Sequence, residues 1–183
     1  MERISTIAIA CVALSILSAA QIDEPKPSVS NDGLTAEQVA IYRAALADFK
    51  PTPGGSPQLA NITAPLGRQH TAFEKCVAGI PEPSEQNTHP PVHRLDSSVV
   101  AGMGLPLVAP WEVPQMRIGP PDPKSPHLGL LTLSEIAFDR EHLRAIVTYD
   151  FNCGGLCGHG KMLALTKSGK EWKISKICGG WLY

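Results

Sequence analysis

The sequence has no excess of charge of either sign, since 16 Lys and Arg residues stand against 17 Asp and Glu residues. It also has no cluster of Lys or Arg, whereas nucleic-acid-binding domains usually concentrate basic residues on one face. The G-x-G-x-x-G and Walker patterns of phosphate-binding loops are missing as well. We therefore expect no nucleic acid among the partners of this protein.

Long apolar runs are missing after the first 20 residues, so we expect no membrane span in the rest of the chain. The N-terminus has a short polar stretch with one Arg, then an apolar run from Ile4 to Leu17, then small residues up to Ala20. This order is typical of a secretory signal peptide, and the run is shorter than the roughly 20 residues of a spanning helix. The sequence thus predicts a signal peptide over residues 1–20 and an exported protein, periplasmic or extracellular.

Cysteine is scarce, with five residues in the whole chain, and Cys11 falls inside the predicted signal peptide. An even set of four remains, which suits disulfide bonds because an exported protein meets an oxidising compartment. Four cysteines allow three pairings, and their spacing leaves these open. The four are Cys76, Cys153, Cys157 and Cys178.

Proline divides the chain into parts. Residues 21–33 are polar and contain two prolines, which predicts a flexible leader, and residues 34–183 have the size of one domain. Within that domain, residues 50–129 hold fifteen of the seventeen prolines, which predicts an irregular segment without long helices or central strands. An edge strand is expected there over residues 93–100. Residues 130–183 remain as the core of a sheet.

A helix is predicted near the start of the domain. Thr35 and Gln38 have the spacing of a capping box, and prolines after residue 50 stop the helix. Apolar residues recur at spacings of three or four and form one stripe, which indicates a helix that covers a sheet. A second, short helix is expected over residues 66–77. The stripe of the first helix consists of Val39, Tyr42, Leu46 and Phe49.

Alternation of apolar and polar residues predicts strands in the last third of the chain. The clearest case covers residues 143–152, where every second residue belongs to an apolar face. Short turns between successive strands favour an antiparallel meander. The predicted fold is therefore α+β, with the N-terminal helix packed on a four-stranded antiparallel sheet. The four strands are expected at residues 131–138, 143–152, 162–166 and 171–178.

The motif CGGLCGHG, at residues 153–160, lies between two of the predicted strands. In a scaffold, Cys153 and Cys157 would bond to each other and close the turn, because glycine permits the backbone geometry that this needs. Cys76 would then bond to Cys178 and tie the proline-rich segment to the last strand. A bond from Cys153 or Cys157 to Cys178 is the alternative pairing. The oxidising compartment favours this scaffold interpretation.

Two other interpretations of the motif involve chemistry. A Cys3His zinc site is the first, since the C-x3-C spacing occurs in such sites. The second makes Cys157 a nucleophile or redox thiol with His159 as its base, although no C-x-x-C pattern supports an oxidoreductase. Outside these two interpretations, His159 is expected to be an exposed loop histidine. The zinc ligands would be Cys153, Cys157, His159 and Cys178.

Several stretches resemble a family of uncharacterised exported bacterial proteins. The resemblance is close over residues 129–183, through LSEIAFD, CGGLCGHG and WKISKICGGW, and looser upstream, through FEKCVAGI and VHRLDSSVV. This chain departs from the family pattern at Lys161-Met162 and at its Leu-Tyr end, and neither departure touches the cysteines. The resemblance implies a bacterial origin and export, and it implies no reaction.

No complete catalytic constellation is present, so no catalytic residue is assigned. We expect an exported, disulfide-stabilised small domain that is a non-enzymatic binding or structural protein and uses no cofactor. Its partner would be a protein or a small ligand. The alternative is a zinc- or thiol-dependent enzyme centred on Cys153, Cys157 and His159.

Overall fold

The computed structural model of this protein describes residues 28–30, 32–51, 55–66, 76, 80, 91–112, 127–154 and 157–182. The predicted signal peptide, most of the predicted leader and nearly all of the helix expected over residues 66–77 lie outside these residues.

The described residues form short elements up to residue 112 and longer strands after residue 127. In chain order they are β1 (Val29–Ser30), α1 (Ala36–Asp48), β2 (Gly55–Ala60), β3 (Val92–His93), α3 (Ser97–Val100), β4 (Leu107–Val108), η1 (Pro110–Glu112), β5 (His127–Leu133), β6 (Ala137–Phe138), β7 (Arg144–Asn152), β8 (Gly158–Ser168) and β9 (Glu171–Leu182).

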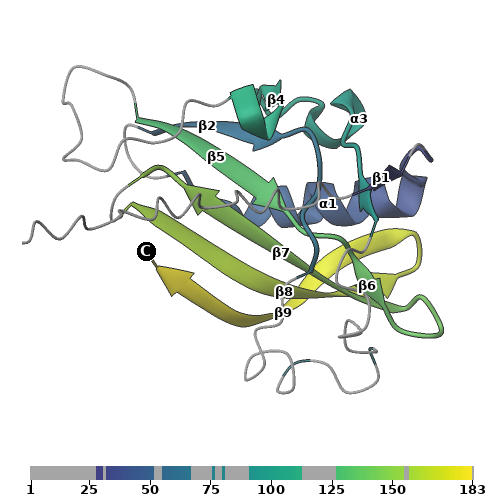
Figure 1. Cartoon of the computed structure of the whole chain (residues 1–183). Coiled ribbons are helices and arrows are strands. Elements are labelled where there is room, and N and C mark those ends of the chain that lie inside the picture. The colour runs from purple at the N-terminus through teal and green to yellow at the C-terminus, as the bar shows by residue number, and fades with distance from the viewer. Residues whose placement is uncertain are drawn as a thin grey trace, which may run out of the picture.

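A mixed sheet forms the centre of the described structure (Figure 1). Seven strands belong to it among the described residues, in the order β4-β2-β5-β7-β8-β9, with β6 paired to β7. β2 runs parallel to both of its neighbours, whereas β5, β6 and β8 pair with β7, and β9 with β8, in the antiparallel sense. β1 and β3 form a separate two-stranded parallel sheet.

The predicted fold, a helix on a four-stranded antiparallel meander, is wrong because the proline-rich segment adds parallel strands to the sheet. The Leu59 N–H donates to the Pro106 carbonyl at 2.9 Å, which places the outward edge of β2 toward β4. The backbone N–H groups of successive residues in a strand point alternately to its two edges. The N–H position of Pro57 therefore faces the same edge as that of Leu59, outside the residues that pair with β4. Its missing N–H therefore costs no ladder bond. The prediction that residues 50–129 contain no central strand is therefore wrong for β2, which lies between β4 and β5 with Pro57 at this tolerated position.

The strands predicted in the last third of the chain are present with different ends. β7 lies within residues 143–152 as expected, but β8 begins at Gly158 and β9 continues to Leu182. The strand expected over residues 131–138 is interrupted, because the Ser134 side chain takes the place of a backbone acceptor for the Thr148 N–H at 2.8 Å. Because β8 begins at Gly158, the last three residues of CGGLCGHG belong to a strand and not to a loop.

α1 begins as the capping box predicts. Thr35 Oγ1 accepts from the Gln38 N–H at 3.2 Å, and the Gln38 side chain accepts from the Thr35 N–H at 2.8 Å. Figure 1 shows the helix running across one face of the sheet, where the side chains of Tyr42 and Leu46 are buried. No helix among the described residues is long and apolar enough to cross a membrane.

The two faces of β7 contribute to different apolar clusters. Alternate residues, from Ala145 to Phe151, pack toward α1, in the larger cluster. Ile146 points to the other face, where it packs with Met162, Leu66 and Ile80. The sheet is thus covered on one face by the helix and on the other by residues of the proline-rich segment.

The edge strand expected over residues 93–100 is wrong beyond His93, because the chain turns into α3. Asp96 Oδ1 accepts from the Ser98 N–H at 2.8 Å and caps this short helix. The Arg43 guanidinium of α1 donates to the Ser98 carbonyl at 2.9 Å, which holds α3 beside α1.

Candidate functional site

The cysteines form two disulfides, Cys76–Cys178 and Cys153–Cys157, which is the pairing that the scaffold interpretation favoured. The first joins residues 102 positions apart and ties the proline-rich segment to β9. The second joins residues four positions apart and closes the connection between β7 and β8. Cys178 packs in the cluster that faces away from α1, whereas Cys153 packs against the cluster under α1.

This pairing leaves none of the four cysteines as the free thiolate that a zinc ligand or a thiol nucleophile requires. The ligand set expected for zinc does not converge, because Cys153 and Cys178 belong to different clusters. No group of three or more His, Cys, Asp or Glu residues in the described part of the chain could hold a metal ion.

His159 is a half-buried strand residue and not the exposed loop histidine that the sequence suggests. Its ring stacks on Phe49, which follows α1, with centroids 5.6 Å apart and planes inclined by 11°. The Tyr149 ring meets it edge-on, with centroids 6.1 Å apart. This packing uses the imidazole as a planar aromatic surface at the corner of the sheet.

Lys161 joins β8 to the end of α1 beside this aromatic corner. Its Nζ lies 2.9 Å from Asp48 Oδ2, and the Tyr149 hydroxyl donates to the same oxygen at 3.2 Å. The hydrogen bond to Asp48 raises the pKa of Lys161, and burial raises the pKa of Tyr149. Lys161 therefore stays charged and Tyr149 stays protonated at neutral pH. The charged lysine and the protonated tyrosine both bind Asp48, so the group holds β7 and β8 against the end of α1 and has a structural role.

The glycine-rich motifs of β8 and β9 meet in the sheet. Gly160 pairs with Trp181, and a Cβ atom at Gly160 would lie 2.1 Å from an indole carbon. The indole Nε1 donates to Asp150 Oδ1 at 2.9 Å and so crosses β8 to reach β7. Gly160 is thus required by the close approach of the indole, whereas Gly154, at φ +89°, serves the turn.

A second polar group, which the sequence did not predict, joins Thr63, His93 and Glu135. His93 Nδ1 lies 2.8 Å from Glu135 Oε2, and the His93 N–H donates to Oε1 at 2.8 Å. The Thr63 hydroxyl also donates to Oε1. Thr63 and Glu135 follow the carboxyl ends of the parallel strands β2 and β5, so the topology places them side by side.

The chemistry of this group is that of an anchor. The carboxylate holds Nδ1 of His93 as a donor, and the Thr63 hydroxyl bonds to the carboxylate and not to the ring, so the three do not form a nucleophilic triad.

The Tyr42 hydroxyl is buried and has no hydrogen-bond partner among the described residues. Burial is the main cause that raises the pKa of Tyr42, and the negative charge of Glu135 raises it further. His93 lies in the motif VHRLDSSVV, directly after Val92, and Glu135 lies in LSEIAFD, two residues after the end of β5. Polar residues placed so close to buried apolar residues were the sequence signal that could have indicated this group.

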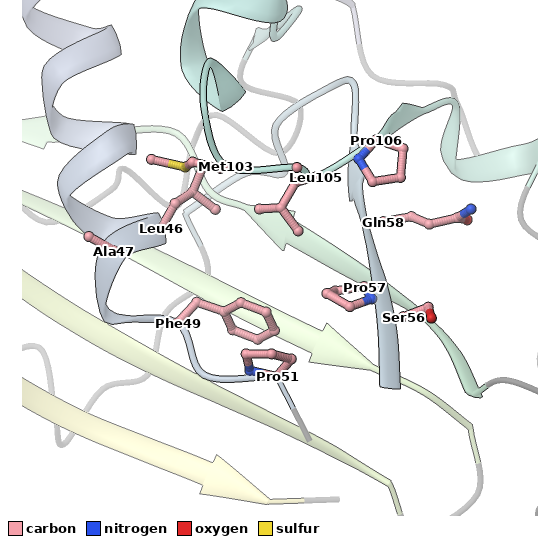
Figure 2. Close-up of a pocket in the computed structure, with 11 residues that line it drawn as sticks. Leu46, Ala47, Phe49, Pro51, Ser56, Pro57, Gln58, Met103, Leu105 and Pro106 are labelled. Carbon is pink, nitrogen blue, oxygen red and sulfur yellow. The ribbon is translucent and has the colours of Figure 1, made fainter. Parts of the chain in front are cut away.

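An apolar groove lies between the end of α1, the edge of β2 and the segment that leads into β4 (Figure 2). Its volume is about 670 Å³, within the range of about 300 to 1,000 Å³ that small-molecule sites occupy. Figure 2 shows Phe49, Pro51 and Pro57 on one side of the groove, with Leu105 and Met103 opposite them. The remaining lining residues are Leu46, Ala47, Ser56, Gln58, Gly104 and Pro106.

The groove exists because the pairing of β2 with β4 stops early. Pro57 has no N–H with which to continue the ladder, and the segment before β4 turns away at Gly102 and Gly104, whose φ angles are +78° and +68°. The prolines of this segment, which gave the sequence no helical or strand periodicity, therefore shape the apolar groove. No sequence periodicity marks it, since its walls come from three separate parts of the chain.

Comparison of the chain with models of protein families, with curated proteins and with solved structures finds no match. The geometry of the two polar groups and of the groove is therefore the basis for assigning their roles. Among them, the groove has the shape of a ligand site, and the polar groups hold elements of the fold together.

Proposed function

We propose that the protein is an exported, disulfide-stabilised domain that binds an apolar ligand in the groove between α1, β2 and residues 103–106. The observation that carries the proposal is the groove itself, which combines ligand-sized volume with a mainly apolar lining from α1, β2 and residues 103–106. The two disulfides support export, because such bonds persist in oxidising compartments. The motif resemblance supports the same compartment, and with it membership of the family of exported bacterial proteins.

The polar groups support binding over catalysis. Each of the four cysteines is bonded, Lys161 is paired with Asp48, and the Thr63 hydroxyl is held by Glu135. These interactions connect helix to sheet or strand to strand, so the side chains that could act chemically are already used in holding the fold together. A preformed apolar site of this kind needs no reactive side chain.

Nile red, a neutral apolar dye, tests the groove in the disulfide-bonded protein. We expect its fluorescence to rise and shift to the blue on binding, and Leu105→Asp to abolish this change because the variant places a charge against the apolar ligand. Leu105 is only half-buried, and thermal unfolding checks that the variant folds. Leu143→Asp, at an exposed leucine outside the groove, is the matched control. Dye binding that survives Leu105→Asp would reject the groove as the site.

A further inference from the structure

The lining of the groove contains no charge that could bind an ion. None of the residues that line it has an ionisable side chain. A charged group inside the groove would lose part of its hydration and gain no counter-charge, at a cost in binding. We therefore expect the part of the ligand inside the groove to be neutral.

The two faces of β2 give the groove polar groups beside its apolar wall. Pro57 points toward Phe49, whereas Ser56 and Gln58 point the other way, as neighbours in a strand do (Figure 2). The Gln58 side chain is half-buried, and no described residue forms a hydrogen bond with its amide. A ligand in this groove can therefore carry a polar group as well as an apolar body.

The ladder between β2 and β4 ends at two prolines that face each other. Leu59 pairs with Leu107, and its N–H donates to the carbonyl of Pro106, the residue before that partner. In a parallel ladder the carbonyl of a residue accepts from the N–H of the residue after its partner. Two residues earlier in β2, this pattern requires the Pro57 carbonyl to accept from the N–H of residue 106. Pro106 has no N–H, so the ladder cannot supply this donor.

The Pro57 carbonyl is thus an acceptor without a donor at the edge of the groove. Pro57 and Pro106 both line the groove, so this carbonyl lies at the gap between β2 and the segment before β4. Hydrogen bonds from the described residues do not reach it. A ligand that covers the carbonyl without donating to it leaves a polar group unpaired, whereas a ligand that donates to it avoids this cost. The acceptor therefore favours a ligand with a hydrogen-bond donor.

The same edge favours a single donor over an extended peptide. A peptide strand that joins a sheet edge needs a donor from that edge as well as an acceptor. Pro57 has no N–H, and the N–H of Leu59 is already bound to the Pro106 carbonyl. A peptide strand would therefore leave its own carbonyl unpaired here, and a small molecule with one donor would not.

We infer that the groove binds a neutral apolar molecule with a hydroxyl or N–H group, which donates to the Pro57 carbonyl. This inference rests on the proposed function and adds the class of ligand to it. The uncharged lining disfavours ions, the apolar wall holds the carbon skeleton, and the end of the ladder provides the acceptor.

Three naphthalenes test the inference. 2-Naphthol has the donor, 2-methoxynaphthalene keeps the oxygen without the donor, and 2-naphthoate is an anion. Their binding to the disulfide-bonded protein is measured at neutral pH by displacement of Nile red. We expect 2-naphthol to bind about two- to tenfold more tightly than 2-methoxynaphthalene, the range of one neutral hydrogen bond, and 2-naphthoate to bind most weakly.

Pro106→Ala tests the acceptor directly, because it restores an N–H opposite the Pro57 carbonyl. The ladder can then supply the donor, and the preference for 2-naphthol over 2-methoxynaphthalene should disappear. Pro51→Ala is the matched control, since it also removes a proline ring from the groove but lies outside β2 and β4. It should weaken both ligands alike and keep the preference. Thermal unfolding checks that both variants fold.

Gln58→Met separates the carbonyl from the side-chain amide as the acceptor. Methionine has a similar length and lacks the amide group, and Gln58 is the lining residue whose oxygen could also accept from the ligand. The preference for 2-naphthol should persist in this variant, because the donor bonds to the backbone carbonyl.

Several results would overturn the inference and leave the proposed function standing. They are equal affinity for 2-naphthol and 2-methoxynaphthalene, a preference that Pro106→Ala leaves unchanged, a preference that Gln58→Met removes, and Nile red that none of the three naphthalenes displaces. A wild-type protein that fails to bind Nile red, or binding that survives Leu105→Asp, would instead reject the proposed function.

Discussion

The indole of Trp181 lies directly on the backbone of Gly160, so that a Cβ atom at Gly160 would be 2.1 Å from a ring carbon. Gly160→Ala should therefore destabilise the protein by about 1 to 3 kcal/mol, the range for overpacking. Urea unfolding measures the loss. Gly33→Ala is the control, since a Cβ there meets nothing within 4 Å. In a Trp181→Ala background most of the cost should disappear, and a cost that persists would contradict the packing explanation.

The two disulfides should contribute unequally to stability. Cys76–Cys178 closes a loop of 102 residues, whereas Cys153–Cys157 closes one of four. On the chain-entropy model, replacing both cysteines of the long pair by serine should lower the free energy of unfolding by about 4.7 kcal/mol, and replacing the short pair by about 2 kcal/mol. Denaturant titrations of the two double variants compare them directly. Equal losses would show that loop closure does not govern their effect.

Glu135 should matter for stability because it accepts hydrogen bonds from both Thr63 and His93. Glu135→Gln removes the charge that all of these bonds share, and we expect a loss of about 1.5 to 3 kcal/mol in the free energy of unfolding. Glu141→Gln, at an exposed position in the turn before β7, is the matched control and should change stability by less than about 0.5 kcal/mol. A similar small effect of Glu135→Gln would show that the anchor is not needed.

Asp139 should make stability depend on acid. It is buried and accepts from the N–H groups of Leu143 and Arg144 at 2.8 and 3.0 Å, with Arg144 Nε at 2.9 Å. Burial opposes its ionisation, but the hydrogen bonds from Arg144 and Leu143 outweigh burial and hold the pKa of Asp139 below its ordinary value of 3.8.

A carboxyl whose pKa is lower in the folded state stabilises the protein above its unfolded pKa, and the stabilisation is lost as the pH falls through the folded pKa. Asp139→Asn should therefore be less stable than the wild type at neutral pH, and the difference should shrink as the pH falls below about 3.8. Thermal unfolding across this acid range measures it. A difference that stays constant with pH would rule out the ionised carboxylate as the cause.

Local patterns were sufficient for the elements that depend on neighbouring residues. The capping box of Thr35 and Gln38 starts α1, and the alternation over residues 143–152 forms β7. The cysteine pairing also follows the expected scaffold. The helix start and the strand alternation are determined within a few residues, so sequence reasoning can reach them, whereas the choice among the three cysteine pairings was left open by the spacing and is made by the structure.

The rest depended on contacts between distant segments. Pro57 is tolerated in β2 because β4 begins only opposite Leu59, beyond the level of Pro57, and β4 lies about fifty residues further along the chain. The pairing of His93 with Glu135 depends on β2 and β5 running in parallel. His159 is packed between strand and helix and not exposed, because Phe49 lies over it.

The sequence by itself determined the start of α1, the alternation of β7 and the four cysteines available for disulfides, because each is a matter of local geometry or composition. Only the tertiary structure decided the mixed sheet, the His93–Glu135 anchor and the apolar groove. The physical reason is that a strand edge or a groove wall is defined by what does, or does not, pair beside it. That partner lies elsewhere in the chain.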